Sequence, residues 1–242
     1  MRAAAVLLAG SMALAACASD EPTSGGGEGG GGAAAEELRV GLAYDTGGRG
    51  DRSFNDSAYA GASAAVEALG GDLQEFSPNE DASNRAEGLA GLAEQGFNPV
   101  IAVGFNYDDV IAEVAPQFPD TTFAQVDGSN ADGAKGDNVT GLIFAEEQGS
   151  FLAGVAAALK SESGHIGFVG GVQSPLIQKF EAGYVAGAQA VNPQITIDRQ
   201  YISPAGDFSG FSDPARGQIV AQGMYDAGAD IVYHAAGGSG VG

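Results

Sequence analysis

The amino-acid sequence predicts an α/β protein with parallel sheets, organised as two lobes of similar design. From Leu38 onwards, short apolar runs alternate with helix-like segments at the spacing of β–α units. A polar stretch rich in Gly, Asp, Asn and Ser, residues 128–138, interrupts this alternation, which then restarts. In addition, 44% of the 242 residues are hydrophobic, which is ample for a buried core.

The first 37 residues do not follow the alternating pattern. Residues 1–16 combine a positive start with a short apolar run, which predicts an export signal peptide. The run ends in Leu-Ala-Ala-Cys, which resembles the lipobox of bacterial lipoproteins, so Cys17 is the expected lipidation site. The alternative is an ordinary signal peptide with a stray cysteine. The glycine-rich residues 17–37 predict a flexible tether.

Residues 38–128 are expected to form the N-terminal lobe. Their apolar runs predict strands at 39–44, 72–76, 100–103 and 122–126. Helices are expected between these strands, at 55–69, 82–95 and 108–117. Pro99 at the start of a strand and Pro119 after a helix agree with the positions that proline favours.

Residues 129–242 are expected to form the C-terminal lobe. Strands are predicted at 139–144, 165–169, 195–202 and 231–234, with helices at 148–159, 180–190 and 219–227. The sequence stops at a glycine-rich run, residues 237–242, directly after the last of these strands. Since a helix should follow that strand, we expect the C-terminal lobe to be incomplete and the sequence to be truncated.

Composition and motifs exclude several classes of function. There are 31 Asp+Glu against 10 Lys+Arg, and the net charge of −21 disfavours a nucleic-acid partner. No run of 18 apolar residues follows the N-terminus, which excludes an integral membrane protein. His165 and His234 have no Cys or His at ligand spacing, so we expect packed or edge histidines and no metal. The sequence contains no P-loop, Gly-x-Ser-x-Gly elbow or recognisable nucleophile–base pair, so neither an enzyme nor a cofactor is expected.

The loop from Asp45 to Ser57 is the candidate ligand mouth. It joins the first predicted strand to the first predicted helix, and it holds acidic, aromatic and amide side chains among glycines. In open α/β sheets, ligands lie beyond the carboxyl ends of the strands, where the N-termini of helices also point. We therefore expect a small-molecule site at this loop.

Several stretches spread over residues 38–242 together resemble one family. They are Val40–Asp45, Asp51–Asn55, Gln125–Gly128, Asn138–Gly141, Gly149–Gly154, Gly164–Gly171 and Phe180–Ala188. The sequence thereby resembles the basic membrane protein family, the purine-nucleoside receptor lipoproteins that feed ABC importers. This resemblance implies a type I periplasmic-binding-protein fold, in which two Rossmann-like lobes are joined by a hinge and hold a ligand in a central cleft.

The resemblance also implies a function and its partners. A monomer, lipid-anchored on the extracytoplasmic face of the cell membrane, would bind a purine nucleoside and deliver it to an ABC permease. The alternative is a sensory lipoprotein of the same fold that signals to a membrane kinase.

A nucleoside offers a flat base and a pair of ribose hydroxyls, so its site needs aromatic faces and carboxylates. By resemblance, Phe54 and Phe180 sandwich the base, although each could instead be a core phenylalanine. Asp45 and Asp127 are implied to contact the ligand, and the alternative is that they cap turns.

Further candidates come from the ends of other predicted elements. Asn55 could contact the base through its amide or serve as the N-cap of the first helix. Gly237 and Gly238 follow the last predicted strand, where bare backbone N–H groups could approach a ligand. Phe105 and Tyr107 are secondary candidates.

Overall fold

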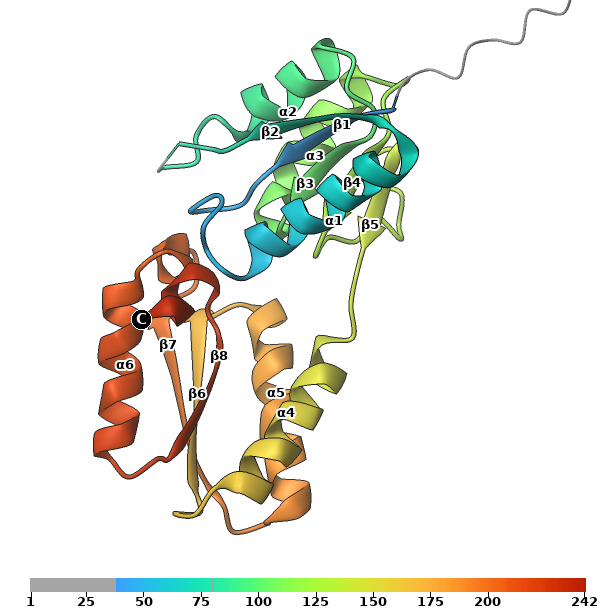
Figure 1. The fold of residues 1–242 in the computed structure, drawn as a ribbon. Helices are drawn as coiled ribbons and strands as arrows, with labels where there is room; N and C mark the ends of the chain where they lie inside the picture. The colour runs from blue at the N-terminus through green and yellow to red at the C-terminus, as the bar shows by residue number, and fades with distance from the viewer. Residues whose placement is uncertain (1–37, 80) are drawn as a thin grey trace, which may run out of the picture. The chain divides into compact units, whose positions relative to one another are not determined.

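The computed structural model describes residues 38–79 and 81–242 (Figure 1). The predicted signal peptide, the lipidation site Cys17 and the tether at 17–37 lie outside the described residues. Within the described part, strands and helices alternate along the chain, and every neighbouring pair of strands is parallel. The predicted α/β class is therefore confirmed. No helix in this part has the length and apolar character that a membrane crossing requires.

The first sheet has five strands in the order β2-β1-β3-β4-β5. Its strands are β1 (Leu38–Ala43), β2 (Gly71–Phe76), β3 (Val100–Val103), β4 (Phe123–Val126) and β5 (Val139–Leu142). Its helices are α1 (Phe54–Leu69), α2 (Arg85–Glu94) and α3 (Asp108–Val114), with short 3₁₀ turns η1 (Phe105–Tyr107) and η2 (Ala115–Gln117).

Apolar side chains cover both faces of this sheet. One core cluster joins Val40 and Leu42 of β1 to Ala62 of α1. The other joins β1 and β3 to α2 and α3 through residues such as Leu89 and Ile111, both fully buried. Burial on two faces explains why the sequence of β3, Val-Ile-Ala-Val, is a continuous apolar run, whereas the edge strand β2 alternates between more and less exposed residues.

The boundary between the two sheets differs from the expected one. We expected the C-terminal lobe to begin at residue 129, but β5 pairs with β4 and so extends the first sheet. Asn138 explains this return of the chain, because its side-chain amide donates hydrogen bonds to the carbonyls of Ala115, Phe118 and Thr121, at 2.9–3.0 Å. The polar segment before β5 is thereby tied to the first sheet, and the change of sheet falls within residues 143–164.

The second sheet has three strands in the order β7-β6-β8. Its elements are α4 (Glu146–Lys160), β6 (His165–Val172), α5 (Pro175–Val191), β7 (Thr196–Ser203), η3 (Phe208–Phe211), α6 (Pro214–Asp226), β8 (Ile231–Ala235) and η4 (Gly237–Val241). Figure 1 shows α4 and α5 on one side of this sheet and α6 on the other. Separate core clusters fill the two sides, one centred on Phe168 and Tyr184 and the other on Val169 and Met224.

Two of these helices begin earlier than predicted because of local capping. Before α5, the Ser174 side chain accepts a hydrogen bond from the N–H of Ile177 (3.4 Å), and Pro175 occupies the first turn. Before α6, Asp213 accepts from the N–H of Arg216 (2.9 Å), again with a proline in the first turn. A polar cap followed by proline is a helix-start signal, and it was overlooked at both positions.

Glycine allows the backbones of α4 and α5 to touch. A Cβ at Gly154 would overlap the carbonyl oxygen of Tyr184, and one at Gly183 would overlap that of Glu147. Gly187 makes the same kind of approach to Phe151. The position of α5, which carries Phe180, therefore depends on the absence of side chains at these positions.

Replacing Gly183 by alanine should lower the stability of the protein by about 1–3 kcal/mol, because the new methyl group forces two packed helices apart. Gly149→Ala on α4 is the matched control: its Cβ would meet no atom within 4 Å, and it should stabilise by about 0.5–1 kcal/mol through helix propensity. Urea unfolding followed by circular dichroism measures both variants. Equal stability changes in the two would contradict this account of the helix contact.

Candidate ligand-binding site

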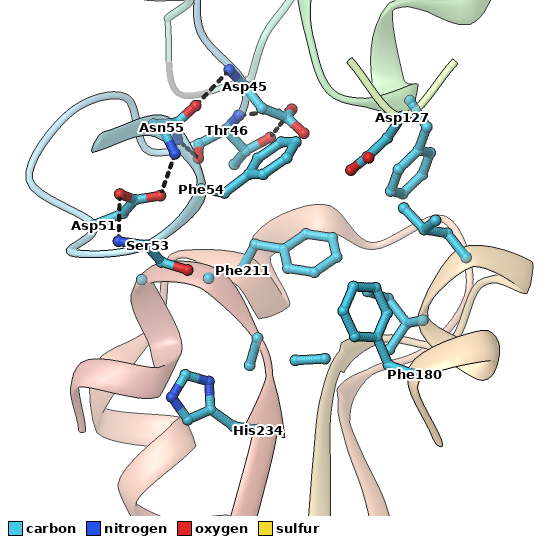
Figure 2. Close-up of a pocket in the computed structure, with 17 residues that line it drawn as sticks. Asp45, Thr46, Asp51, Ser53, Phe54, Asn55, Asp127, Phe180, Phe211 and His234 are labelled. Atoms are coloured by element: carbon cyan, nitrogen blue, oxygen red, sulfur yellow. Dashed lines mark hydrogen bonds between the residues drawn. The ribbon is translucent and has the colours of Figure 1, made fainter. Parts of the chain in front are cut away.

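All seven residues predicted to bind a ligand line a single cavity of about 200 Å³ (Figure 2). They are Asp45, Phe54, Asn55, Asp127, Phe180, Gly237 and Gly238. The loops after β1 and β4 contribute one part of the wall, and α5, η3 and the turn after β8 contribute the other. The structure thus brings together residues up to 193 positions apart, counted from Asp45 to Gly238. Whether they contact a ligand stays a prediction.

The side chain of Asp51 holds the backbone of the candidate loop in place. The Asp51 carboxylate accepts hydrogen bonds from the backbone N–H groups of Ser53 (3.0 Å), Asn55 (2.8 Å) and Asp56 (3.0 Å). Asp56 in turn accepts from the N–H groups of Gly50 and Arg52, and these two hydrogen bonds lower its pKa. The N-terminal N–H groups of α1 are satisfied in this way, and Phe54 is held as the first residue of the helix.

The N-cap of this helix is Ser53, so Asn55 is the second residue of the helix and not its cap. The N–H groups of Asn55 and Asp56 in the first turn donate to Asp51. The side chain of Asn55 instead joins two elements. The amide oxygen accepts a hydrogen bond from the N–H of Asp45 (3.0 Å), and the amide nitrogen donates to the carbonyl of Thr46 (3.5 Å). Asn55 is 2% exposed, so it links the end of β1 to the start of α1.

Asp45 is buried and has partners on several elements. Its carboxylate accepts hydrogen bonds from the N–H of Thr46 (2.7 Å) and the side-chain amide of Asn106 (3.0 Å). It also forms an ion pair with Arg85 (3.0 Å). A Cβ at Gly104 would overlap this carboxylate, and the φ angle of +105° at that position also favours glycine.

Asp127 has fewer hydrogen-bond partners than Asp45. It follows β4 with a φ angle of 59°, and its N–H donates to the carbonyl of Leu142 (2.9 Å). Its carboxylate receives no hydrogen bond from the residues that the structure describes, and Figure 2 shows it directed toward the space beside Phe54. Burial, with help from Glu146 and Asp45 and against Lys179, raises the pKa of Asp127 to about 6.

Four phenylalanines supply aromatic surface to the cavity. Phe54 and Phe180 each lie partly in the cavity wall and partly against a core cluster, so the core interpretation holds in part and the stacking role stays a prediction. Phe211 of η3 was missed, and its ring lies at the centre of the view in Figure 2. Phe105 lines the cavity and meets Phe211 edge-on, with centroids 6.4 Å apart. Tyr107 does not line it, because that ring is fully buried and its hydroxyl donates to Tyr44.

The turn after β8 closes the wall. Gly237 has a φ angle of +51°, and a Cβ at Gly238 would lie 3.2 Å from the carbonyl oxygen of Phe211. His234 also lines the cavity, and partial burial lowers its pKa. The expected edge position is confirmed, because β8 is an edge strand of the second sheet; the place of His234 at the carboxyl end of this strand was a usable signal for the cavity wall.

His165, the other histidine of the sequence, has a structural partner, because its Nε2 lies 2.9 Å from the Asp198 carboxylate. Within residues 38–79 and 81–242, no cluster of three or more His, Cys, Asp or Glu side chains could hold a metal ion.

The sequence comparisons identify similar proteins. A family model described as "ABC transporter substrate-binding protein PnrA-like" matches residues 39–242. The ABC transporter nucleoside-binding protein BmpA of Lactococcus lactis subsp. cremoris is 37% identical over 209 residues, which cover 85% of this chain and 57% of the relative. Basic membrane protein A1 of Borrelia garinii subsp. bavariensis is 36% identical over 194 residues, covering 79% and 55%. The chain thus spans little more than half the length of these relatives.

Solved structures show the same fold. A solute-binding protein of an ABC transporter system from Aeropyrum pernix K1 superposes with a TM-score of 0.74 at 28% identity, covering 84% of this chain and 56% of that one. A second, from Conexibacter woesei, gives a TM-score of 0.61 at 27% identity, with 82% and 64% covered. These likenesses confirm the expected type I periplasmic-binding-protein fold.

The raised pKa of Asp127 has a consequence for stability. The folded state binds this proton more tightly than the unfolded state, so the carboxylate destabilises the fold above about pH 6 and this cost disappears as the pH falls toward 4. Asp127→Asn should therefore stabilise the protein at pH 7.5 by about 1–2 kcal/mol, because each pKa unit corresponds to about 1.4 kcal/mol and solvent screens part of it. Asparagine tolerates the positive φ angle equally well.

Urea unfolding of wild type and Asp127→Asn at pH 7.5 and pH 4.5 checks this prediction. All other acidic groups are common to both proteins, so their titration cancels in the difference. A stability difference of the same size at both pH values would contradict it.

Proposed function

The chain belongs to the family of PnrA-like ABC transporter substrate-binding proteins, and on this premise we propose that it binds a purine nucleoside in the cavity described above. The family is one of binding proteins rather than enzymes. We further propose that the protein is a monomer that delivers the nucleoside to the permease of an ABC importer. Cys17 would anchor it to the extracytoplasmic face of the cell membrane through the tether at 17–37.

The main support for this proposal is that one cavity is lined both by aromatic rings and by a carboxylate that has no hydrogen-bond partner among the described residues. Phe54 and Phe180 line one cavity together with Asp127, whose carboxylate accepts no hydrogen bond from the described residues. A flat base between aromatic faces gains about 1–3 kcal/mol from each stacking contact. A carboxylate that is partly desolvated and unpartnered gains a charge-assisted hydrogen bond when a hydroxyl group approaches it. A nucleoside offers both groups in one small molecule.

The remaining predicted residues complete the proposed contacts. The backbone N–H groups of Gly237 and Gly238 would donate to the polar edge of the ligand. Asn55 uses one amide N–H and one oxygen lone pair within the protein, which leaves further hydrogen-bonding capacity for the ligand. Asp45 would contact the ligand through Oδ2, because Oδ1 carries the ion pair and the shorter hydrogen bonds.

Charge narrows the class of ligand. Three carboxylates, those of Asp45, Asp51 and Asp127, line the cavity, whereas none of the described lining residues is lysine or arginine. The lowered pKa of His234 favours its neutral form at pH 7. A phosphate group would be repelled in this setting, so we propose a nucleoside rather than a nucleotide. The printed name of the Lactococcus relative, a nucleoside-binding protein, agrees with this choice.

Isothermal titration calorimetry tests the proposed ligand. Inosine, guanosine or adenosine should release heat of binding, whereas ribose, glucose and the matching nucleoside monophosphates should not. Phe54→Ala and Phe180→Ala should each weaken binding about 5- to 150-fold, the equivalent of the 1–3 kcal/mol of a stacking contact. Phe151→Ala is the control, since this ring is partly exposed on α4 and lies outside the cavity wall. No heat with any nucleoside would overturn the proposal.

The affinity should also depend on pH. If the ionised form of Asp127 accepts the hydroxyl hydrogen bond, nucleoside affinity is full above about pH 7 and falls as the pH drops through about 6. Asp127→Asn should bind tenfold or more weakly at pH 7.5, since hydrogen bonds to charged groups contribute about 1.5–3 kcal/mol, and its affinity should lose this pH dependence. Titrations at pH 5.0, 6.0 and 7.5 measure both effects. Parallel pH profiles in the two proteins would rule out Asp127 as the titrating acceptor.

A further inference from the structure

Arg85 occupies an unfavourable place in its own helix. It is the first residue of α2, where the positive end of the helix dipole disfavours a cation. It is also the only arginine or lysine between Ser53 and Ala134 in a strongly acidic chain. Local helix stability therefore does not explain a positive charge here.

Long-range contacts explain it instead. The Arg85 guanidinium donates from Nη2 to the Asp45 carboxylate (3.0 Å) and to the Thr46 hydroxyl (3.1 Å), across about 40 positions of sequence. It lies over the ring of Tyr107, 5.4 Å from the centroid. The side chains of the ion pair are 11% and 10% exposed, so solvent screens their attraction much less than it would at the surface.

The ion pair lies behind the cavity wall and not in it. Asp45 lines the cavity, whereas Arg85 does not. Asp45 and Asp127 line the same cavity, and their negative charges repel each other: Asp45 is among the causes of the raised pKa of Asp127. The other charged groups that act on Asp127 are Glu146 and Lys179, which form an ion pair with each other (3.3 Å).

We propose that Arg85 is a positioning residue of the binding site: its guanidinium fixes the Asp45 carboxylate and offsets its charge, so that Asp45 and Asp127 can face one ligand together. The relevance to ligand binding rests on the proposed function. Arg85 touches no ligand itself. Its charge sets how strongly Asp45 acts on Asp127, and its Nη2, which donates to both Asp45 Oδ1 and the Thr46 hydroxyl, sets where that Asp45 oxygen lies.

Three variants separate charge from geometry. Arg85→Gln removes the charge, so the repulsion of Asp127 by Asp45 is no longer compensated and Asp127 takes up its proton at higher pH. Arg85→Lys keeps the charge but replaces the guanidinium Nη2, which donates to both Asp45 and Thr46, by a compact ammonium, so the titration of Asp127 stays near that of wild type while nucleoside affinity falls. In Arg85→Gln/Asp45→Asn both charges are gone, and the titration of Asp127 returns to near the wild-type value. Arg199→Gln, which breaks an ion pair with Glu181 elsewhere, is the matched control.

Carboxyl carbon NMR of the unliganded protein measures the titration without any ligand. We expect the titration midpoint of Asp127 to rise by about half a pKa unit or more in Arg85→Gln, with no change in the control. An unchanged midpoint in Arg85→Gln would overturn the proposed charge compensation. If Arg85→Gln does not fold, a midpoint in the double variant that differs from wild type by more than this amount would overturn it equally.

Calorimetry with the nucleoside that wild type binds tests the second part of the proposal, which is that Arg85 positions Asp45 for ligand binding. We expect Arg85→Lys and Arg85→Gln to bind tenfold or more weakly, and Arg199→Gln to bind within twofold of wild type. Wild-type affinity in both Arg85 variants would overturn the positioning role. Failure of wild type to bind any nucleoside would instead count against the proposed function, while the NMR result would still decide whether Arg85 offsets the charge of Asp45.

Discussion

The buried carboxylate of Asp45 is the interaction on which the candidate site depends. Asp45 follows β1, the strand between β2 and β3 in the first sheet, and its carboxylate joins segments that are far apart in sequence. Arg85 at the start of α2 and Asn106 of η1 both bind this carboxylate. The backbone N–H of Asp45 donates to the side chain of Asn55 in α1. Since a buried charge that loses its partner is strongly destabilising, these segments are held in one arrangement. The loop that carries Phe54 is therefore supported from behind.

The two acidic residues at the ends of β1 and β4 differ in how completely the protein satisfies them. Asp45 has an ion pair and several hydrogen bonds, whereas no described residue donates to the carboxylate of Asp127. Its raised pKa means that the folded protein is less stable with this group ionised. Residues that lower stability without forming contacts are concentrated at functional sites. That contrast favours Asp127 as the residue kept for the ligand and Asp45 as the residue that also organises the loop.

Local sequence patterns predicted most of the fold, whereas the resemblance to a known family implied most of the candidate residues now found in the cavity wall. Apolar runs marked the strands, and loops at the carboxyl ends of β1 and β4 marked Asp45 and Asp127. Contacts between residues that are far apart in the sequence were missed. Arg85 meets Asp45 across 40 residues, and β5 joins the first sheet through side-chain contacts of Asn138. Phe211 was missed because nothing in its neighbouring sequence distinguishes a cavity wall from a core, whereas His234 was missed although it lies at the carboxyl end of a predicted strand.

The cavity wall divides its chemistry between the two sheets. All of its described carboxylates, those of Asp45, Asp51 and Asp127, belong to loops of the first sheet. The second sheet contributes apolar and aromatic side chains of α5 and η3, together with His234 and the backbone of Gly237 and Gly238. Aromatic rings come from both parts, Phe54 and Phe105 from the first and Phe180 and Phe211 from the second, so a flat group held between Phe54 and Phe180 needs both parts. A ligand with a hydroxyl-bearing half and a flat half satisfies both parts at once. Recognition by such a wall therefore depends on the arrangement of the two sheets as much as on any single residue.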